Sequence, residues 1–65
     1  MLKMSDESRR FLRMYFLEIF ECNTLNEALL ALDAFITAEG LDINDDMTAF
    51  GHEATAVYDD IFYSN

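Results

Sequence analysis

One stretch of this 65-residue chain decides its fold: residues 24–40, which read TLNEALLALDAFITAEG. It opens with a capping box, because Thr24 can cap a helix and Glu27 follows three residues later. Gly40 closes the stretch, at a position where glycine favours the end of a helix. Between these residues, apolar side chains recur at the three- and four-residue spacing of a buried helical face: Leu25, Ala28, Leu29, Leu32, Phe35 and Ile36. The stretch therefore predicts an amphipathic helix with a defined beginning and end.

A first helix is predicted upstream, beginning after Ser5 and ending at residues 22–23. Ser5 is a suitable N-cap, and Asp6 and Glu7 fall in the first turn, where the helix dipole favours anions. The predicted buried stripe consists of Phe11, Leu12, Tyr15, Phe16, Ile19 and Phe20. Met14 and Leu17 fall on the opposite side. A helix that is apolar on more than one side is central in its fold or buried in an interface.

A third helix is predicted after a loop at residues 41–44, with Asn44 or Asp45 as its cap. Its expected apolar stripe consists of Met47, Phe50, Ala54, Val57, Tyr58 and Ile61. Gly51 leaves two interpretations open. It is a weak point or a late helix start, or it forms a small-residue ridge that lets another helix approach closely. The polar end, residues 63–65, is expected to fray.

These patterns indicate an all-α fold. The chain has no proline and two glycines, and no segment shows the alternation of a strand. Three helices with short connections predict a small antiparallel three-helix bundle, forming one domain over residues 1–65. The hydrophobic fraction of 52% is high for so short a chain. Homodimerisation is therefore one way in which the bundle could be completed.

Charge is distributed unevenly along the chain. Lys3, Arg9, Arg10 and Arg13 are its only basic residues, whereas residues 14–65 hold eleven of the thirteen carboxylates. The net charge of −9 would repel phosphate, so we expect no direct binding to nucleic acid. For the three arginines, we favour pairing with carboxylates of other helices or of a second subunit.

The sequence offers little for catalysis or metal binding. Cys22 is the only cysteine and His52 the only histidine, which excludes a disulfide within the chain and an ordinary zinc site. A Cys–His pair is an alternative, but a lone cysteine is more often a small buried hydrophobe. Residues 42–53 resemble a calcium loop in their oxygen positions, yet Met47 stands where such a loop needs glycine. We expect no enzyme activity and no cofactor.

The carboxylates beyond residue 38 define a candidate partner-binding face. Asp59 and Asp60 are notable because they fall near a helix C-terminus, where the dipole disfavours anions. The nearby aromatic side chains could anchor a partner. The predicted partner-binding residues are Glu39, Asp42, Asp45, Asp46, Glu53, Asp59, Asp60 and Tyr63.

These features predict a cytoplasmic, acidic protein-binding module without a membrane span. Its expected partner is a basic, nucleic-acid-handling protein such as a CRISPR effector, nuclease or polymerase, whose phosphate sites the carboxylates would occupy. In size and charge, though in no motif, the chain resembles the small acidic inhibitors made by bacteriophages and mobile elements. The alternative is a structural or regulatory homo-oligomer that mimics no nucleic acid.

Overall fold

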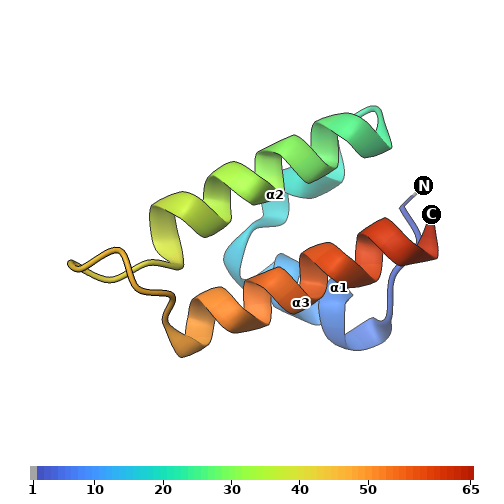
Figure 1. The fold of residues 1–65 in the computed structure, drawn as a ribbon. Helices are drawn as coiled ribbons and strands as arrows, with labels where there is room; N and C mark the ends of the chain where they lie inside the picture. Colours follow the sequence, from blue (N-terminus) through green and yellow to red (C-terminus); the bar gives the residue numbers. More distant parts are fainter. Residues whose placement is uncertain (1) are drawn as a thin grey trace.

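Four helical segments make up the computed structural model, which describes residues 2–65. They are α1 (Asp6–Tyr15), the 3₁₀-helix η1 (Leu17–Glu21), α2 (Leu25–Glu39) and α3 (Ala49–Ser64). No strand occurs within residues 2–65, so the expected all-α class is confirmed. The molecule measures 36 × 20 × 20 Å, with the loop of residues 40–48 at one end and both chain ends at the other (Figure 1).

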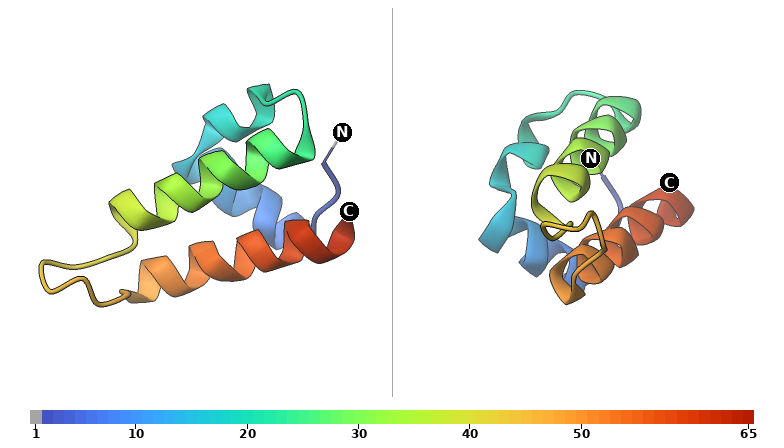
Figure 2. Two further views of the ribbon diagram at one scale, coloured as in Figure 1. Left: turned by 45° about the horizontal axis from the view of Figure 1, so that its top comes forward. Right: turned by 60° about the vertical axis from the view of Figure 1, so that its left-hand side comes forward.

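An antiparallel pair of long helices forms the body of the molecule. α2 and α3 lie side by side and run in opposite directions (Figures 1 and 2), and they share the most extensive helix contact. α1 packs against α3, while η1 packs against α1 and α2. The predicted helical bundle is therefore present, with α1 shorter than expected and its continuation turned onto α2.

The caps of the first two helices are confirmed. The Ser5 hydroxyl accepts a hydrogen bond from the Ser8 backbone amide at 3.2 Å. The Thr24 hydroxyl accepts one from the Glu27 amide at 3.1 Å. The Glu27 carboxylate reaches back to the amide of Asn23 at 3.0 Å, one residue before the cap itself. Short-range capping chemistry thus sets where α1 and α2 begin.

The predicted end of the first helix was wrong. α1 ends at Tyr15, because Phe16 leaves the helical region with φ −147° and ψ 63°. This change lets the Phe16 ring stack on Phe35 of α2, with centroids 4.7 Å apart, while η1 buries Ile19 completely. Packing against α2 has overridden the helical pattern of the local sequence.

The predicted start of the third helix was also wrong. α3 begins at Ala49 and is capped by Thr48, neither by Asn44 nor by Asp45. The Thr48 hydroxyl accepts from the Gly51 amide at 3.1 Å and donates to the Gly40 carbonyl at 3.0 Å. Met47 lies before the helix and forms an isolated antiparallel bridge with Leu41. One threonine therefore both caps α3 and ties it to the end of α2.

Gly40 and Gly51 allow the two long helices to meet at this end. A Cβ on Gly40 would lie 2.8 Å from the Gly51 Cα, and a Cβ on Gly51 would collide with the Gly40 carbonyl oxygen. Gly40 has φ −96°, an ordinary conformation, so here space and not backbone freedom requires glycine. For Gly51, the late helix start and the close approach of another helix are both correct.

The core is small and continuous, and aromatic rings extend it toward the loop. Its buried apolar residues are Leu12, Ile19, Ala28, Leu32, Ile36, Ala54, Val57 and Ile61. Beside them, Phe50 of α3 contacts Phe11, Tyr15 and Phe35 at centroid distances of 5.3, 4.9 and 5.9 Å. Phe50 thereby joins α1 to α2 through ring contacts, which add to the stabilisation from burial alone.

The C-terminal residues do not fray as expected. α3 continues to Ser64, and the Asn65 side-chain amide donates to the carbonyls of Ile61 and Lys3, each at 2.8 Å. The Asn65 side-chain oxygen accepts from the Lys3 amide at 3.1 Å. These bonds hold the segment before α1 against the end of α3.

We predict that Gly51→Ala destabilises the protein although alanine favours helices. Alanine would add up to about 1 kcal/mol through propensity, but overpacking against Gly40 costs about 1–3 kcal/mol. The expected net loss of about 1–2 kcal/mol would lower the melting temperature by roughly 5–10 °C in circular dichroism. Ala34→Gly, at an exposed position on α2, measures propensity alone. A rise in melting temperature for Gly51→Ala would contradict the close contact.

Candidate protein-binding site

Half of the predicted partner-binding residues gather at one end of the molecule. Glu39 is the last residue of α2, and Asp42, Asp45 and Asp46 follow it in the loop of residues 40–48. All four side chains are exposed. The loop and the end of α2 together carry these four carboxylates and no Lys, Arg or His. We call residues 39–48 the acidic loop.

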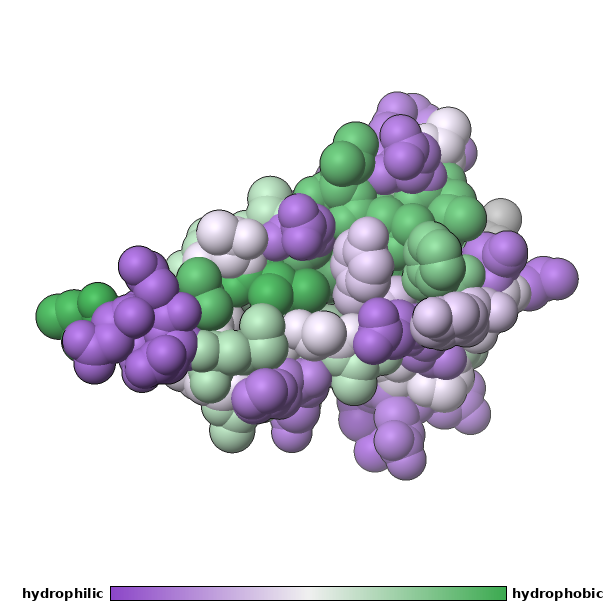
Figure 3. Space-filling view, viewed as in Figure 1, coloured by the Kyte–Doolittle hydropathy of each residue, from purple (hydrophilic) through white to green (hydrophobic). Residues whose placement is uncertain are grey.

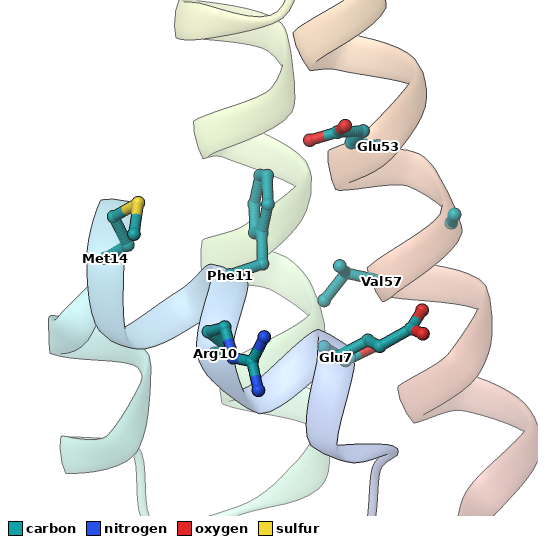
Figure 4. A pocket seen from close by; sticks show the side chains of 8 residues that line it. Glu7, Arg10, Phe11, Met14, Glu53 and Val57 are labelled. Carbon is teal, nitrogen blue, oxygen red and sulfur yellow. The ribbon is translucent and has the colours of Figure 1, made fainter.

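Glu53 lies away from the acidic loop, beside a groove between α1 and α3. The groove has a volume of about 380 Å³. Figure 4 shows Glu53 reaching from α3 toward α1 and Glu7 reaching from α1 toward α3, with Phe11 and Val57 between them. Neither histidine nor cysteine lines this groove. It offers an apolar floor between two carboxylates, and Arg10 lines it as well.

Asp59, Asp60 and Tyr63 lie at the opposite end of α3 from the acidic loop. Asp59 lies ten positions beyond Ala49, the first residue of α3, which corresponds to about 15 Å along the helix. Asp59 is exposed and Tyr63 is 82% exposed, whereas Asp60 is half-buried. The eight predicted residues therefore occupy three places and do not form one continuous face.

Asp60 serves the fold itself. Its carboxylate accepts a hydrogen bond from the Ser5 backbone amide at 2.8 Å and another from the Ser64 hydroxyl at 3.3 Å. The Ser5 amide, with help from the Ser8 hydroxyl, lowers the pKa of Asp60 below its ordinary value of 3.8. The carboxylate that looked uncompensated near a helix C-terminus is thus held by the N-terminus of α1, where the dipole favours it.

Asp42 shapes the acidic loop through its side chain. One carboxylate oxygen, Oδ1, accepts hydrogen bonds from the amides of Asn44 at 2.8 Å and Asp46 at 3.0 Å. The Asp42 backbone adds a turn, since its amide donates to the Asp46 carbonyl at 2.9 Å and its carbonyl accepts from the Asp45 amide at 3.0 Å. An aspartate that bonds the backbone two residues on is a common way to stabilise a turn.

The base of the loop is fixed as well. The bridge between Leu41 and Met47 pairs its two sides, and the Thr48 amide donates to the Gly40 carbonyl at 2.9 Å. Asp45 occupies the left-handed region with φ 62°, which Asp and Asn tolerate better than most residues. Backbone hydrogen bonds thus define the shape of the loop before any partner arrives.

Ile43 is the feature of this loop that sequence reasoning missed. Its side chain is 96% exposed, although isoleucine is among the residues most often buried. Figure 3 shows hydrophilic side chains gathered over this end of the molecule, with hydrophobic atoms at its extremity. The sequence did contain a sign of this, because Ile43 belongs to no apolar stripe and stands among acidic and amide residues.

The arrangement gives no indication of a metal or a catalytic pair. Within residues 2–65, no three His, Cys, Asp or Glu side chains are placed to hold an ion. The expectation that a helix is already under way at Met47 was wrong, but the Asp42 oxygen that would lead a calcium loop is occupied by two amides. Cys22 lies just before the start of α2, whereas His52 lies in the first turn of α3, which adjoins the other end of α2, so most of the length of α2, about 20 Å, separates them.

Comparisons with known proteins add no relative. No family model, no curated protein and no solved structure matches the chain. Among the helices of residues 2–65, none combines the length and the apolar character needed to cross a bilayer. Function is therefore inferred from the geometry and the charge of the chain.

We predict that Asp60→Asn lowers stability at neutral pH, because a charge-assisted hydrogen bond to the Ser5 amide becomes a neutral one. The loss should be a few tenths to about 1 kcal/mol, since the group is partly exposed. Asp59→Asn is the matched control and should cost nothing, because Asp59 is exposed and the helix terminus disfavours its charge.

The pH dependence of Asp60→Asn follows from the lowered pKa of Asp60. The stabilisation from Asp60 is fully present above the ordinary pKa and is lost as pH falls through the lowered pKa. Urea unfolding should show a constant difference between wild type and Asp60→Asn from about pH 7 to pH 5. That difference should shrink below about pH 4. A difference that persists undiminished at pH 2 would show that the carboxylate charge is not responsible.

Proposed function

We propose that this protein is a small acidic binding module that docks its acidic loop onto a basic protein. The exposure of Ile43 carries the proposal. A large apolar side chain stands 96% exposed on a loop with three aspartates, and hydrogen bonds hold that loop in shape. A central apolar anchor within a charged rim is the arrangement found at protein interfaces.

The chemistry of the loop defines the partner. A partner surface that fits this loop has an apolar recess for Ile43. Around the recess it carries Lys or Arg side chains that pair with Asp42, Asp45 and Asp46. Sites with these cations commonly hold nucleic-acid phosphates. We therefore propose that the partner is a nucleic-acid-handling protein, such as a nuclease, CRISPR effector or polymerase. The module would act in the cytoplasm as an inhibitor of the phage or mobile-element type, by occupying the phosphate site.

The order of the loop supports tight binding. Flexible segments lose conformational freedom when they dock, which lowers affinity. Here the two Asp42 carboxylate bonds, the Leu41–Met47 bridge and the Thr48–Gly40 bond already define the backbone. Binding therefore needs little further ordering. The uniformly negative charge of the loop should also speed the encounter with a basic surface.

A bacterial lysate passed over the immobilised chain at low salt provides the test. A partner that fits the proposal is basic, elutes as salt is raised, and is displaced by the nucleic acid that it binds. If the retained proteins are neutral or acidic, or if nucleic acid does not compete, the proposed function is wrong. Loop variants then decide whether the acidic loop makes the contact.

We predict that Ile43→Ser weakens binding to such a partner at least tenfold, which corresponds to about 1.4 kcal/mol or more for an interface anchor. The fold should be unaffected, because Ile43 lies outside the core. Leu30→Ser is the matched control, since Leu30 is exposed on α2 away from the loop. Isothermal titration calorimetry measures both. Equal effects of the two substitutions would indicate a general apolar contribution instead of an anchor.

We predict that Asp45→Asn with Asp46→Asn slows association several-fold and reduces its salt dependence, because steering by charge is weakened. Asparagine tolerates the left-handed conformation of Asp45, so the loop should keep its shape. Asp33→Asn with Asp59→Asn removes the same charge from exposed positions elsewhere. Stopped-flow rates that fall equally for both pairs would mean that overall charge, and not the loop, guides binding.

A further inference from the structure

The break between α1 and η1 displays an apolar pair between groups of opposite charge. Met14 is 68% exposed and Leu17 is 61% exposed. Arg10 and Arg13 precede the pair, Glu18 and Glu21 follow it, and all four charged side chains are exposed. We call these six residues the α1–η1 face.

The order of these six residues along the chain is symmetric about the bond between residues 15 and 16. Counting outward from that bond, Met14 corresponds to Leu17, Arg13 to Glu18, and Arg10 to Glu21. Each apolar residue therefore corresponds to an apolar residue, and each cation corresponds to an anion. A segment with this property is complementary to a second copy of itself in the reverse direction.

Contacts across a two-fold axis between identical chains pair residues in the same reciprocal way. When residue i of one copy meets residue j of the other, residue j of the first also meets residue i of the second. A two-fold axis through the break would place Met14 against Leu17 of the other copy. The same axis would place Arg13 against Glu18 and Arg10 against Glu21, each twice. This pairing would give each of the six residues a partner of matching character.

We propose that the α1–η1 face binds the same face of a second copy, forming a two-fold homodimer. The charge distribution favours a second copy of this chain as the partner at this face. The chain has net charge −9, and its only other basic residues are Lys3 and Arg9. Two copies that met through α2, α3 or the acidic loop would oppose carboxylates. The α1–η1 face carries equal numbers of arginines and glutamates, so two copies can approach there without that repulsion.

The surface beside Met14 has room for a protruding side chain. Met14 lines the groove of about 380 Å³ between α1 and α3, together with Phe11 and Val57 (Figure 4). A second hollow of about 500 Å³ is lined by Asp6, Arg9, Arg10, Arg13 and Met14. A small specific interface needs about 600 Å² from each subunit. That is roughly one eighth of the 4593 Å² surface of this chain.

Sedimentation velocity tests the apolar centre of this interface. The wild-type chain of 7.5 kDa should sediment as a dimer as its concentration rises from about 10 µM to 1 mM. Met14→Gln with Leu17→Gln should weaken the dimer at least tenfold while leaving the circular dichroism spectrum unchanged. Leu30→Gln with Phe62→Gln removes two other exposed apolar side chains and should leave the dimer intact. A monomeric wild type, or loss of the dimer in the second variant instead of the first, overturns the proposal.

A charge exchange tests the orientation of the two copies. Arg13→Glu and Glu18→Arg should each weaken the dimer several-fold to tenfold, because each places like charges together at two symmetric positions. The double variant should recover the wild-type affinity. Glu18→Arg also reduces the net negative charge, so general repulsion alone predicts a tighter dimer for it. A tighter dimer for Glu18→Arg, or no recovery in the double variant, would rule out this pairing. Binding through the acidic loop uses other residues and does not depend on the outcome.

Discussion

The contact between the end of α2 and the beginning of α3 is the constraint on which the rest of this structure depends. Gly40 and Gly51 approach so closely that neither position has space for a Cβ. The Thr48 hydroxyl lies between them and bonds to the backbone of both. Close packing is thereby combined with hydrogen bonds to a backbone carbonyl where one helix ends and to a backbone amide where the next begins.

The positions of the two proposed interaction surfaces follow from that contact. With the ends of α2 and α3 joined, the residues between them must project outward, which places Ile43 and the aspartates at the extremity of the molecule. The same contact places Phe50 against Phe35, Phe11 and Tyr15. These rings hold α1 in position, and η1 then turns away to cover α2. The acidic loop and the α1–η1 face are thus two outcomes of one helix pairing.

Sequence reasoning succeeded where the deciding interaction is local. The caps at Ser5 and Thr24 bond residues three positions away, so their patterns are readable in the sequence. Most of its failures came where the deciding partner is distant, although the local Thr48 cap, which bonds the Gly51 amide three positions on, was also missed. The break at Phe16 depends on Phe35, and the role of Asp60 depends on Ser5, fifty-five residues away. The candidate site shows the same division. The acidic residues were visible in the sequence, but their separation into three places and the exposure of Ile43 required the fold.

The hydrogen bonds between Lys3 and Asn65 have a consequence for the order in which the protein folds. The bond between Thr48 and Gly40 joins residues eight positions apart, whereas the bonds between Lys3 and Asn65 join residues sixty-two positions apart. Closing a longer loop loses more chain entropy, and such contacts generally form after the local ones that offset their cost. The helix pair should therefore be the folding nucleus, with the amino-terminal segment docking last. The same segment should be the first to open in the native state, so its amides should exchange with solvent ahead of those in α2.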